Sequence, residues 1–322
     1  NALVTKIKEQ RITEKIQPVN VWVIDAAETP EYPAKPRKKL NILLGIFFGI
    51  FGGIGLAFFI EYLDNTIKSS EDVEENLHIP VLGVIPFSKI KNQRIENVVV
   101  DEPASLITEN YRALRTSVML CSAEKPPQTI LVTSMASGEG KTTTAANLAF
   151  TIAKTGKNVL LVDGDLRRPR LHKVFNLENT SGLSTFLSGV SSGDILQKSS
   201  VGNLSIMTSG PIPPIPSELL NSVRMEKLVK TLSTKFDHII FDSAPVLSVT
   251  DSQILTRFID SIIVVARAGH TTYEAARKGL KILKEIEPHP IGMVINAVDT
   301  KRGWINHYYG YDGYCSRVAD DS

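Results

Sequence analysis

Thr129-Ile-Leu-Val-Thr133 leads into the loop Ser134-Met-Ala-Ser-Gly-Glu-Gly-Lys-Thr-Thr143, which is followed by Ala145-Ala-Asn-Leu-Ala-Phe-Thr-Ile-Ala153. An apolar strand, a glycine-bearing loop that ends in Gly-Lys-Thr, and a helix form the layout of a phosphate-binding P-loop. Gly138 and Gly140 allow the backbone to turn tightly, and the loop N–H groups and the helix N-terminus then face an anion. The stretch therefore predicts a nucleotide-phosphate site.

The residues of this loop have distinct predicted roles. Lys141 is expected to reach the β- and γ-phosphates of ATP, and the Thr142 hydroxyl is expected to ligate Mg²⁺. One position departs from the usual pattern, because Met135 stands where the first glycine is normally found. The predicted ATP-binding residues of the loop are Ser137, Gly138, Glu139, Gly140, Lys141, Thr142 and Thr143.

Strand-like and helix-like runs alternate from Thr129 onward, and Thr272–Ile286 is the clearest helix among them. The strand-like runs are mostly continuous apolar stretches, as buried parallel strands require. The pattern predicts an α/β fold, with a doubly wound, mostly parallel sheet of the P-loop NTPase type. The predicted strands are Ile130–Thr133, Val159–Val162, Leu204–Met207, His238–Phe241, Ile262–Ala266 and Ile291–Asn296.

Carboxylates follow two of these strands. Asp163 and Asp165 come after one apolar run, and Asp242 comes directly after another. Ligands of a parallel sheet gather at the carboxyl ends of its strands, so these acids should approach the P-loop. A kinase, unlike a water-cleaving ATPase, needs a carboxylate that accepts the proton of its substrate hydroxyl. The predicted catalytic residues are Lys141, Asp163 and Asp165, and the predicted metal ligands are Thr142, Asp163 and Asp242.

Further polar residues flank this predicted site. Arg167, Arg168 and Arg170 follow the first acidic pair, where they would either steady phosphate charge or simply lie on the surface. Asn296 stands at the end of a late strand and is predicted to contact adenine.

The segment Ile42–Ile60 contains no charged residue. It is just long enough to cross a hydrocarbon core of about 30 Å as a helix. A helix buried in a soluble protein is rarely apolar on all sides over this length. The segment is therefore predicted to span a membrane, and its glycines, including Gly45 and Gly49, offer a face for close helix packing.

The charges on the two sides of this predicted span conflict with the P-loop. Basic residues from Lys35 to Lys39 precede it and acidic residues from Glu61 to Glu75 follow it, so the positive-inside rule places the N-terminal flank in the cytoplasm. The P-loop, however, follows the span and requires cytoplasmic ATP. We expect the ATP requirement to prevail, with the orientation fixed by an earlier span.

Composition limits the remaining function classes. The net charge of +2 gives no general case for a nucleic-acid partner. Cys121 and Cys315 lie far apart and suggest neither a metal site nor a redox pair, which favours a reducing compartment.

Two motifs outside the nucleotide site indicate protein contacts. Glu109, Arg112 and Arg115 share one stripe of a predicted helix over 102–122, which would be either a solvated face or a subunit contact. The C-terminal tail contains four clustered tyrosines, which would be either an aromatic interaction patch or accessible phosphate acceptors. These tyrosines are Tyr308, Tyr309, Tyr311 and Tyr314.

Together these motifs resemble the bacterial tyrosine kinases (BY-kinases) of capsule and exopolysaccharide export, in the Gram-negative arrangement that fuses span and kinase. The resemblance rests on the P-loop, Val162-Asp-Gly-Asp-Leu-Arg167, Asp242-Ser-Ala-Pro245, the Glu109 stripe, the proline-rich approach to the span and the tyrosine cluster. It implies ATP- and Mg²⁺-dependent autophosphorylation of the tail tyrosines in trans within a ring-shaped oligomer. It also implies control of polysaccharide polymerisation and export, a phosphotyrosine phosphatase partner, and a deviant-Walker, MinD-like fold.

The resemblance sets the expected organisation of the chain. It implies a bacterial inner-membrane protein with a periplasmic N-terminal flank and a cytoplasmic kinase domain, of which the first span and most of the periplasmic domain are missing here. Two alternatives stay open: a partition-type ATPase, which would carry a lysine near Ala136, and a co-polymerase that only senses ATP. The expected segments are a periplasmic end (1–39), a span (40–61), a linker (62–101), the kinase domain (102–300) and the tail (301–322).

Overall fold

The computed structural model describes residues 2–15, 22, 35–87, 95–121, 126–190, 194–199 and 201–299. The chain forms two units, Asn1–Leu63 and Asp64–Ser322. The first unit contains the helices α1 (Ala2–Lys15) and α2 (Lys38–Leu63). The alternating stretch Val19–Ile24, whose pattern predicts a strand, lies outside the described residues apart from Trp22.

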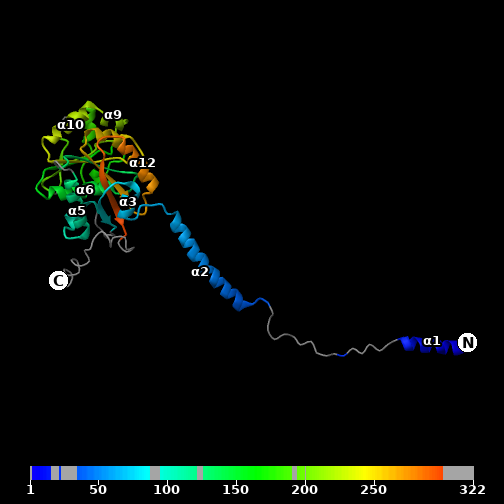
Figure 1. Cartoon of the computed structure of the whole chain (residues 1–322). Helices are drawn as coiled ribbons and strands as arrows, with labels where there is room; N and C mark the ends of the chain where they lie inside the picture. The colour runs from blue at the N-terminus through cyan, green and yellow to red at the C-terminus, as the bar shows by residue number, and fades with distance from the viewer. Residues whose placement is uncertain are drawn as a thin grey trace, which may run out of the picture. The chain divides into compact units, whose positions relative to one another are not determined.

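Helix α2 contains the predicted span (Figure 1). None of its residues is buried. It is the one helix of the described segments that is long and apolar enough to cross a membrane. Its exposed apolar surface is unusual for a helix in water and suits a lipid environment.

The second unit is built on an eight-stranded sheet with the order β1-β8-β7-β2-β6-β3-β5-β4. Neighbouring strands are parallel, except for the antiparallel pair of β4 and β5. The predicted α/β fold with a mostly parallel sheet is therefore confirmed. The strands are β1 (Val81–Pro86), β2 (Thr129–Ser134), β3 (Val159–Asp163), β4 (Gln197–Lys198), β5 (Leu204–Met207), β6 (His238–Asp242), β7 (Ser261–Arg267) and β8 (Pro290–Val298).

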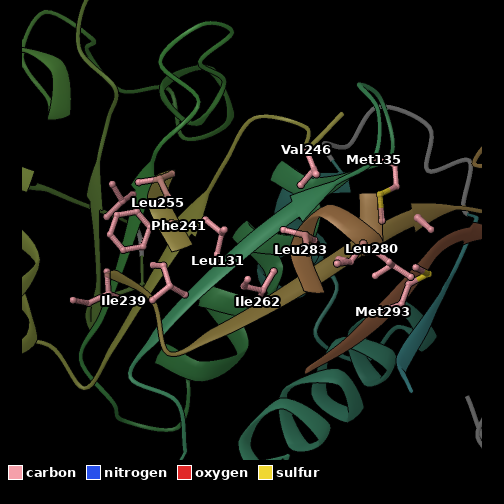
Figure 2. Packing of buried hydrophobic residues seen from close by; sticks show 14 of the residues in the cluster. Leu131, Met135, Ile239, Phe241, Val246, Leu255, Ile262, Leu280, Leu283 and Met293 are labelled. Atoms are coloured by element: carbon pink, nitrogen blue, oxygen red, sulfur yellow. The ribbon is translucent and has the colours of Figure 1, made fainter. Parts of the chain in front are cut away.

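Helices cover both faces of this sheet. Successive residues of a strand point to opposite faces, so each strand contributes side chains to two apolar clusters, one on each face. In β2, Leu131 faces one cluster, whereas Ile130 and Val132 face the other. Figure 2 shows Leu131 in the first cluster, with Leu280 and Leu283 of α12. That cluster is covered by α3 (Ser70–Leu77), α8 (Leu183–Ser188), α9 (Pro216–Leu220), α10 (Val223–Ser233), α11 (Asp251–Leu255) and α12 (Tyr273–Lys284). The other is covered by α4 (Val98–Asp101), α5 (Leu106–Leu120), α6 (Lys141–Ala153) and α7 (Leu171–Val174).

Helix α5 begins later than the predicted residue Glu102. Glu102 precedes a proline, which disfavours the helical conformation, and Ser105 caps the helix by accepting a hydrogen bond from the N–H of Thr108 at 3.3 Å. The helical spacing of apolar residues over 102–122 predicts one buried face that includes Ala104, but Ala104 lies before the helix and is exposed. The other residues predicted on that face, Ile107, Tyr111, Leu114 and Val118, are buried as expected.

A second boundary prediction was wrong. The polar composition of residues 89–101 predicts a loop, but a 3-10 turn (Ile95–Asn97) leads into α4. Val99 is buried there against α6: its N–H donates to Asn147 Oδ1 at 3.3 Å, and its carbonyl accepts from Lys154 Nζ at 2.6 Å. These partners lie about 50 residues away in sequence, so local polarity gave no sign of the turn.

Candidate active site

The P-loop joins β2, which ends at Ser134, to α6, which begins at Lys141. Gly138 and Gly140 have φ values of 84° and 98°, in the left-handed region that glycine adopts without strain. A side chain at Gly140 would also collide with the amide nitrogen of Asn296. Both predicted glycine roles are therefore required by the backbone of the loop.

Glu139 lies in this loop, but its side chain points into the protein. Its Oε2 accepts the N–H of Ala136 at 2.9 Å, and its Oε1 accepts the hydroxyl hydrogen of Thr271 at 2.5 Å. Burial raises the pKa of this carboxyl group. The Glu139 side chain thus stabilises the conformation of the loop. Only the backbone of Glu139 remains available for the predicted contact with ATP.

Loss of the Thr271 hydroxyl is expected to loosen the loop. In Thr271→Val, a buried carboxylate oxygen loses its partner, which should destabilise the protein by about 1–3 kcal/mol and weaken ATP binding. Thr271→Ser keeps the hydroxyl and serves as the control. Thermal unfolding and ATP titration test this, and equal values for the two variants would contradict it.

Met135, at the unusual first position of the loop, has a packing role. Its side chain is fully buried in the cluster that contains Leu131 (Figure 2). It lies against Gly279 of α12, where a Cβ atom would collide with the sulfur. This position therefore belongs to the apolar core of the unit, which explains why a large apolar residue replaces glycine there.

The two strand-end acids are direct neighbours. Asp163 at the end of β3 is paired in register with Asp242 at the end of β6, and both are buried. Asp163 Oδ2 accepts the N–H groups of Arg170 at 3.1 Å and Leu171 at 3.0 Å. Asp163 Oδ1 and both carboxylate oxygens of Asp242 have no hydrogen-bond partner. Such an arrangement of buried acceptors suits a cationic ligand.

This crowding changes the protonation of the two acids. Burial, followed by the charge of Asp242, raises the pKa of Asp163 to about 8. Burial also raises the pKa of Asp242 to about 6, although the charge of Lys141 opposes the shift. Lys141 Nζ lies 3.3 Å from Asp165 Oδ2. Burial lowers the pKa of Lys141, but the charges of Asp242, Asp165 and Asp163 outweigh it and the net shift is upward.

These shifts predict a pH dependence of stability without nucleotide. Both acids have folded pKa values above their ordinary value of 3.8, so the folded state binds more protons than the unfolded state. Their stabilisation is complete below that ordinary value and is lost as pH rises through about 6 and 8. Unfolding free energy in EDTA should fall by a few kcal/mol, as an order of magnitude, from about pH 5.5 to about pH 8.5. Asp163→Asn should have a shallower slope, and an identical slope would contradict the assignment.

The arginines after β3 divide into two kinds. Arg167 is held by Asp251, with Nε at 2.7 Å from Oδ2 and an Nη at 3.1 Å from Oδ1. Arg168 and Arg170 are exposed, and the charge of Arg170 lowers the pKa of Asp242. Of the predicted phosphate-steadying arginines, Arg167 is therefore occupied by a structural pair, whereas Arg170 lies near the site.

Asn296 lies against the P-loop, where its Nδ2 donates to the carbonyl of Glu139 at 2.9 Å. Its predicted contact with adenine stays a prediction. Two residues that sequence reasoning missed also support the loop: Thr271, and Arg267, which donates to the carbonyl of Gly138 at 3.2 Å. Arg267 is the last residue of the apolar strand β7 and Thr271 follows that strand, and no local pattern marks either residue.

The predicted contact stripe on α5 is partly engaged within the chain. Arg112 pairs with Glu109 and donates to the carbonyl of Pro103 at 3.1 Å. Arg115 donates to the carbonyl of Thr151 at 3.1 Å. The predicted phosphate acceptors Tyr308, Tyr309, Tyr311 and Tyr314 lie outside the described residues.

The chain matches two known families: one described as "G-rich domain on putative tyrosine kinase" over residues 1–61, and one described as "AAA domain" over residues 127–291. It is 40% identical to the tyrosine-protein kinase YwqD of Bacillus subtilis (strain 168), over 66% of this chain and 90% of that protein. The chain belongs to the bacterial tyrosine-protein kinases. It is also 31% identical to the tyrosine-protein kinase etk of Escherichia coli (strain K12), over 92% of this chain but only 43% of that longer protein.

Two solved structures, one of them a tyrosine-kinase domain, have the same fold. The kinase domain of Escherichia coli tyrosine kinase ETK matches 73% of this chain and 96% of its own length, with 31% identity and a TM-score of 0.68. The chimerical protein CapA2B2 matches 72% of this chain and all of its own, with 35% identity and a TM-score of 0.67. The predicted family, enzyme class and nucleotide-binding fold are therefore confirmed.

Proposed function

We propose that this chain carries the catalytic domain of an ATP-dependent protein-tyrosine autokinase, with the roles predicted for Lys141, Asp163, Asp165 and Asp242. The observation that best supports these roles is the register pair of Asp163 and Asp242, which holds three buried, unpartnered carboxylate oxygens near Lys141. A site that only bound nucleotide would not require a second buried acid beside the metal-supporting one.

The P-loop would hold the phosphates of ATP. Backbone N–H groups at the start of α6 face the anion, and Lys141 is already charged and positioned by Asp165 at 3.3 Å. When the phosphates bind, Lys141 would exchange its contact with Asp165 for a contact with phosphate oxygens. Asp165 would keep its other partner, the N–H of Arg168, which donates to Asp165 Oδ1 at 2.9 Å. Lys141 thereby stabilises the charge that develops as the phosphoryl group transfers.

The site also fits Mg²⁺. The residues that would hold it are Thr142, Asp242 and Asp163. The two acids offer unpartnered buried oxygens, and the Thr142 hydroxyl lies near Asp242. Among the described residues no group of three His, Cys, Asp or Glu side chains forms a ready-made metal site. Mg²⁺ usually keeps several waters and takes further ligands from substrate phosphates, so one or two protein carboxylates are enough to bind it. When bound, Mg²⁺ would neutralise phosphate charge and favour the ionised forms of both acids.

Asp163 would then act as the base. The phenolic oxygen of the substrate tyrosine forms a bond to the γ-phosphorus, the bond from that phosphorus to the β,γ-bridging oxygen breaks, and ADP leaves. The phenolic proton passes to the Asp163 carboxylate, whose Oδ2 is held by the N–H groups of Arg170 and Leu171. These two bonds fix the acceptor in place for proton transfer.

The proposed substrates are Tyr308, Tyr309, Tyr311 and Tyr314 of another copy of the chain in a ring-shaped oligomer. A ring supplies the head-to-tail contact that transfer in trans requires. The stripe of Glu109, Arg112 and Arg115 is its proposed interface. In support, Glu109 is exposed on α5 and Arg112 keeps a partly exposed side chain beside it.

Removal of both arginines is expected to break this ring. Arg112→Ala with Arg115→Ala should give a smaller species in light scattering and reduce phosphotyrosine, because tails lose access to neighbouring sites. A Lys227→Ala, Lys230→Ala variant on α10 removes the same charge from another helix as a control. A full-sized ring with normal phosphotyrosine in the arginine variant would refute the interface.

The wider role follows from the whole family resemblance and is also proposed. Residues 1–39 would be the periplasmic end of a co-polymerase domain, 40–61 an inner-membrane span, 62–101 a linker, 102–300 the cytoplasmic kinase domain and 301–322 its tail. Regulation of capsule or exopolysaccharide polymerisation and export would be the process served. The export machinery and a phosphotyrosine phosphatase would be the partners.

One experiment separates this proposal from its alternatives. The full chain is incubated with labelled ATP and Mg²⁺, and label is followed in phosphotyrosine and in free phosphate. Label in tail phosphotyrosine supports the kinase. Free phosphate alone indicates an ATPase, and bound but unconsumed ATP indicates a co-polymerase that senses nucleotide; either outcome overturns the proposal.

A further inference from the structure

A pocket of about 330 Å³ lies between α3 and α12, outside the site described above (Figure 1 shows the two helices). Its floor is apolar, since Leu77 of α3 and Leu280 of α12 are both buried. Its walls are polar and mostly basic, and consist of Asn76, Arg277, Lys281, Lys284 and Glu285.

The three cations of this pocket are exposed and, among the residues that the structure describes, make no hydrogen bond or ion pair. Arg277 and Lys281 are four positions apart on α12, and Lys281 and Lys284 are three apart, so they crowd one stripe of the helix. Like charges at these spacings destabilise a helix by a few tenths of a kcal/mol for each pair. The only carboxylate that lines the pocket within the described segments is that of Glu285.

The charge at the helix end explains part of this stripe. Lys281 and Lys284 lie in the last turn of α12, where cations complement the helix dipole. Arg277 lies in the first half of the helix, where the dipole gives it no advantage. The helix dipole therefore does not explain why Arg277 lines the same pocket as the two lysines.

We propose that this pocket binds a phosphate-bearing anion, with the phosphate on Arg277, Lys281 and Lys284 and its carbon portion over Leu77 and Leu280. A guanidinium and two ammonium groups converging on one site are suited to phosphate oxygens. The volume is larger than one phosphate group requires, which leaves room for the organic part of the ligand.

Chain connectivity identifies one source of such a phosphate. The N–H of Tyr273, the first residue of α12, donates to the carbonyl of Asn65 at 3.0 Å, and the N–H of Ile67 donates to the carbonyl of Thr271 at 2.8 Å. The start of α12 is thus tied to the segment that directly follows α2, the proposed span. That segment would leave a bilayer at its headgroups, so anionic phospholipid is one source and a soluble phosphorylated compound is the other.

Lysine acylation, read by mass spectrometry residue by residue, tests this in the full chain. The chain is placed in nanodiscs of phosphatidylcholine, in nanodiscs that also contain phosphatidylglycerol, and in phosphatidylcholine nanodiscs with added inorganic pyrophosphate, all without nucleotide or Mg²⁺. Acylation of Lys281 and Lys284 should slow about threefold in an anion arm, because a site two-thirds occupied leaves one third of the amines free. Lys227, exposed on α10, is the internal reference. The residue-level readout separates this pocket from the P-loop, which also binds pyrophosphate.

The arms and two variants decide the outcome. Protection with phosphatidylglycerol alone identifies lipid as the source, protection with pyrophosphate alone identifies a soluble ligand, and protection in neither overturns the proposal. Arg277→Gln should abolish protection, whereas Lys278→Gln, the same charge change at a neighbouring exposed residue outside the pocket, should keep it. Protection that survives Arg277→Gln would show a diffuse charge effect and also overturn the pocket.

Discussion

Replacement of Lys141 by Met is expected to lower the rate of tyrosine phosphorylation by about 10²–10³-fold or more, because its ammonium group is the cation the P-loop directs at the transferring phosphate. The side chain is only 13% exposed, so water cannot replace its charge effectively. Methionine has nearly the same length and shape, and the backbone of α6 does not depend on the ammonium group. We therefore expect the loss in the chemical step rather than in folding.

Phosphotyrosine formation at saturating ATP, together with thermal unfolding, measures this effect. Lys157→Met is the matched control, because Lys157 is exposed after α6 and is expected to leave activity unchanged. The acids around Lys141 should retain their protons to higher pH in Lys141→Met, since its charge favours their ionised forms. A folded Lys141→Met protein with wild-type phosphotyrosine would show that the assigned P-loop chemistry is wrong.

The nucleotide loop and the sheet were predictable because their signals are local. Gly138, Gly140 and Lys141 stand within four positions, and the strands are continuous apolar runs that the structure confirms to within one or two residues at each end. Asp163 and Asp242 were predicted to approach the P-loop from the general behaviour of parallel strands. Their direct register pairing follows from β3 and β6 being neighbours in the sheet.

The support of the site was not predictable, because it depends on pairs distant in sequence. Glu139 and Thr271 are 132 residues apart, and Arg167 and Asp251 are 84 apart. No local sequence pattern indicates that the Glu139 side chain points into the protein. None indicates that Arg167, alone of the three arginines, forms an ion pair with Asp251. The sequence therefore assigned Glu139 to ATP and left Arg167 undecided, whereas burial and hydrogen bonding give both a structural role.

Asp163→Asn is expected to slow tyrosine phosphorylation by about 10²–10⁴-fold, the usual contribution of a positioned acid or base. The amide oxygen of asparagine can still accept the N–H groups of Arg170 and Leu171, now donated to Asp163 Oδ2. Its NH₂ group can occupy the position of the unpartnered Oδ1 and face Asp242. The fold should therefore be kept, and stability without nucleotide near neutral pH should rise, because one of two crowded acids is removed.

What asparagine cannot do is accept a proton from the tyrosine hydroxyl. Most of the nucleotide affinity should remain, since Lys141, Thr142 and the loop backbone are untouched, whereas kcat should fall with little change in KM for ATP. Asp165→Asn is the matched comparison: it removes the partner of Lys141 but not the proposed proton acceptor, and a smaller loss is expected. Single-turnover phosphorylation and ATP titration on both variants separate chemistry from binding. Normal rates in Asp163→Asn with a large loss in Asp165→Asn would reverse the two roles and make Asp165 the base.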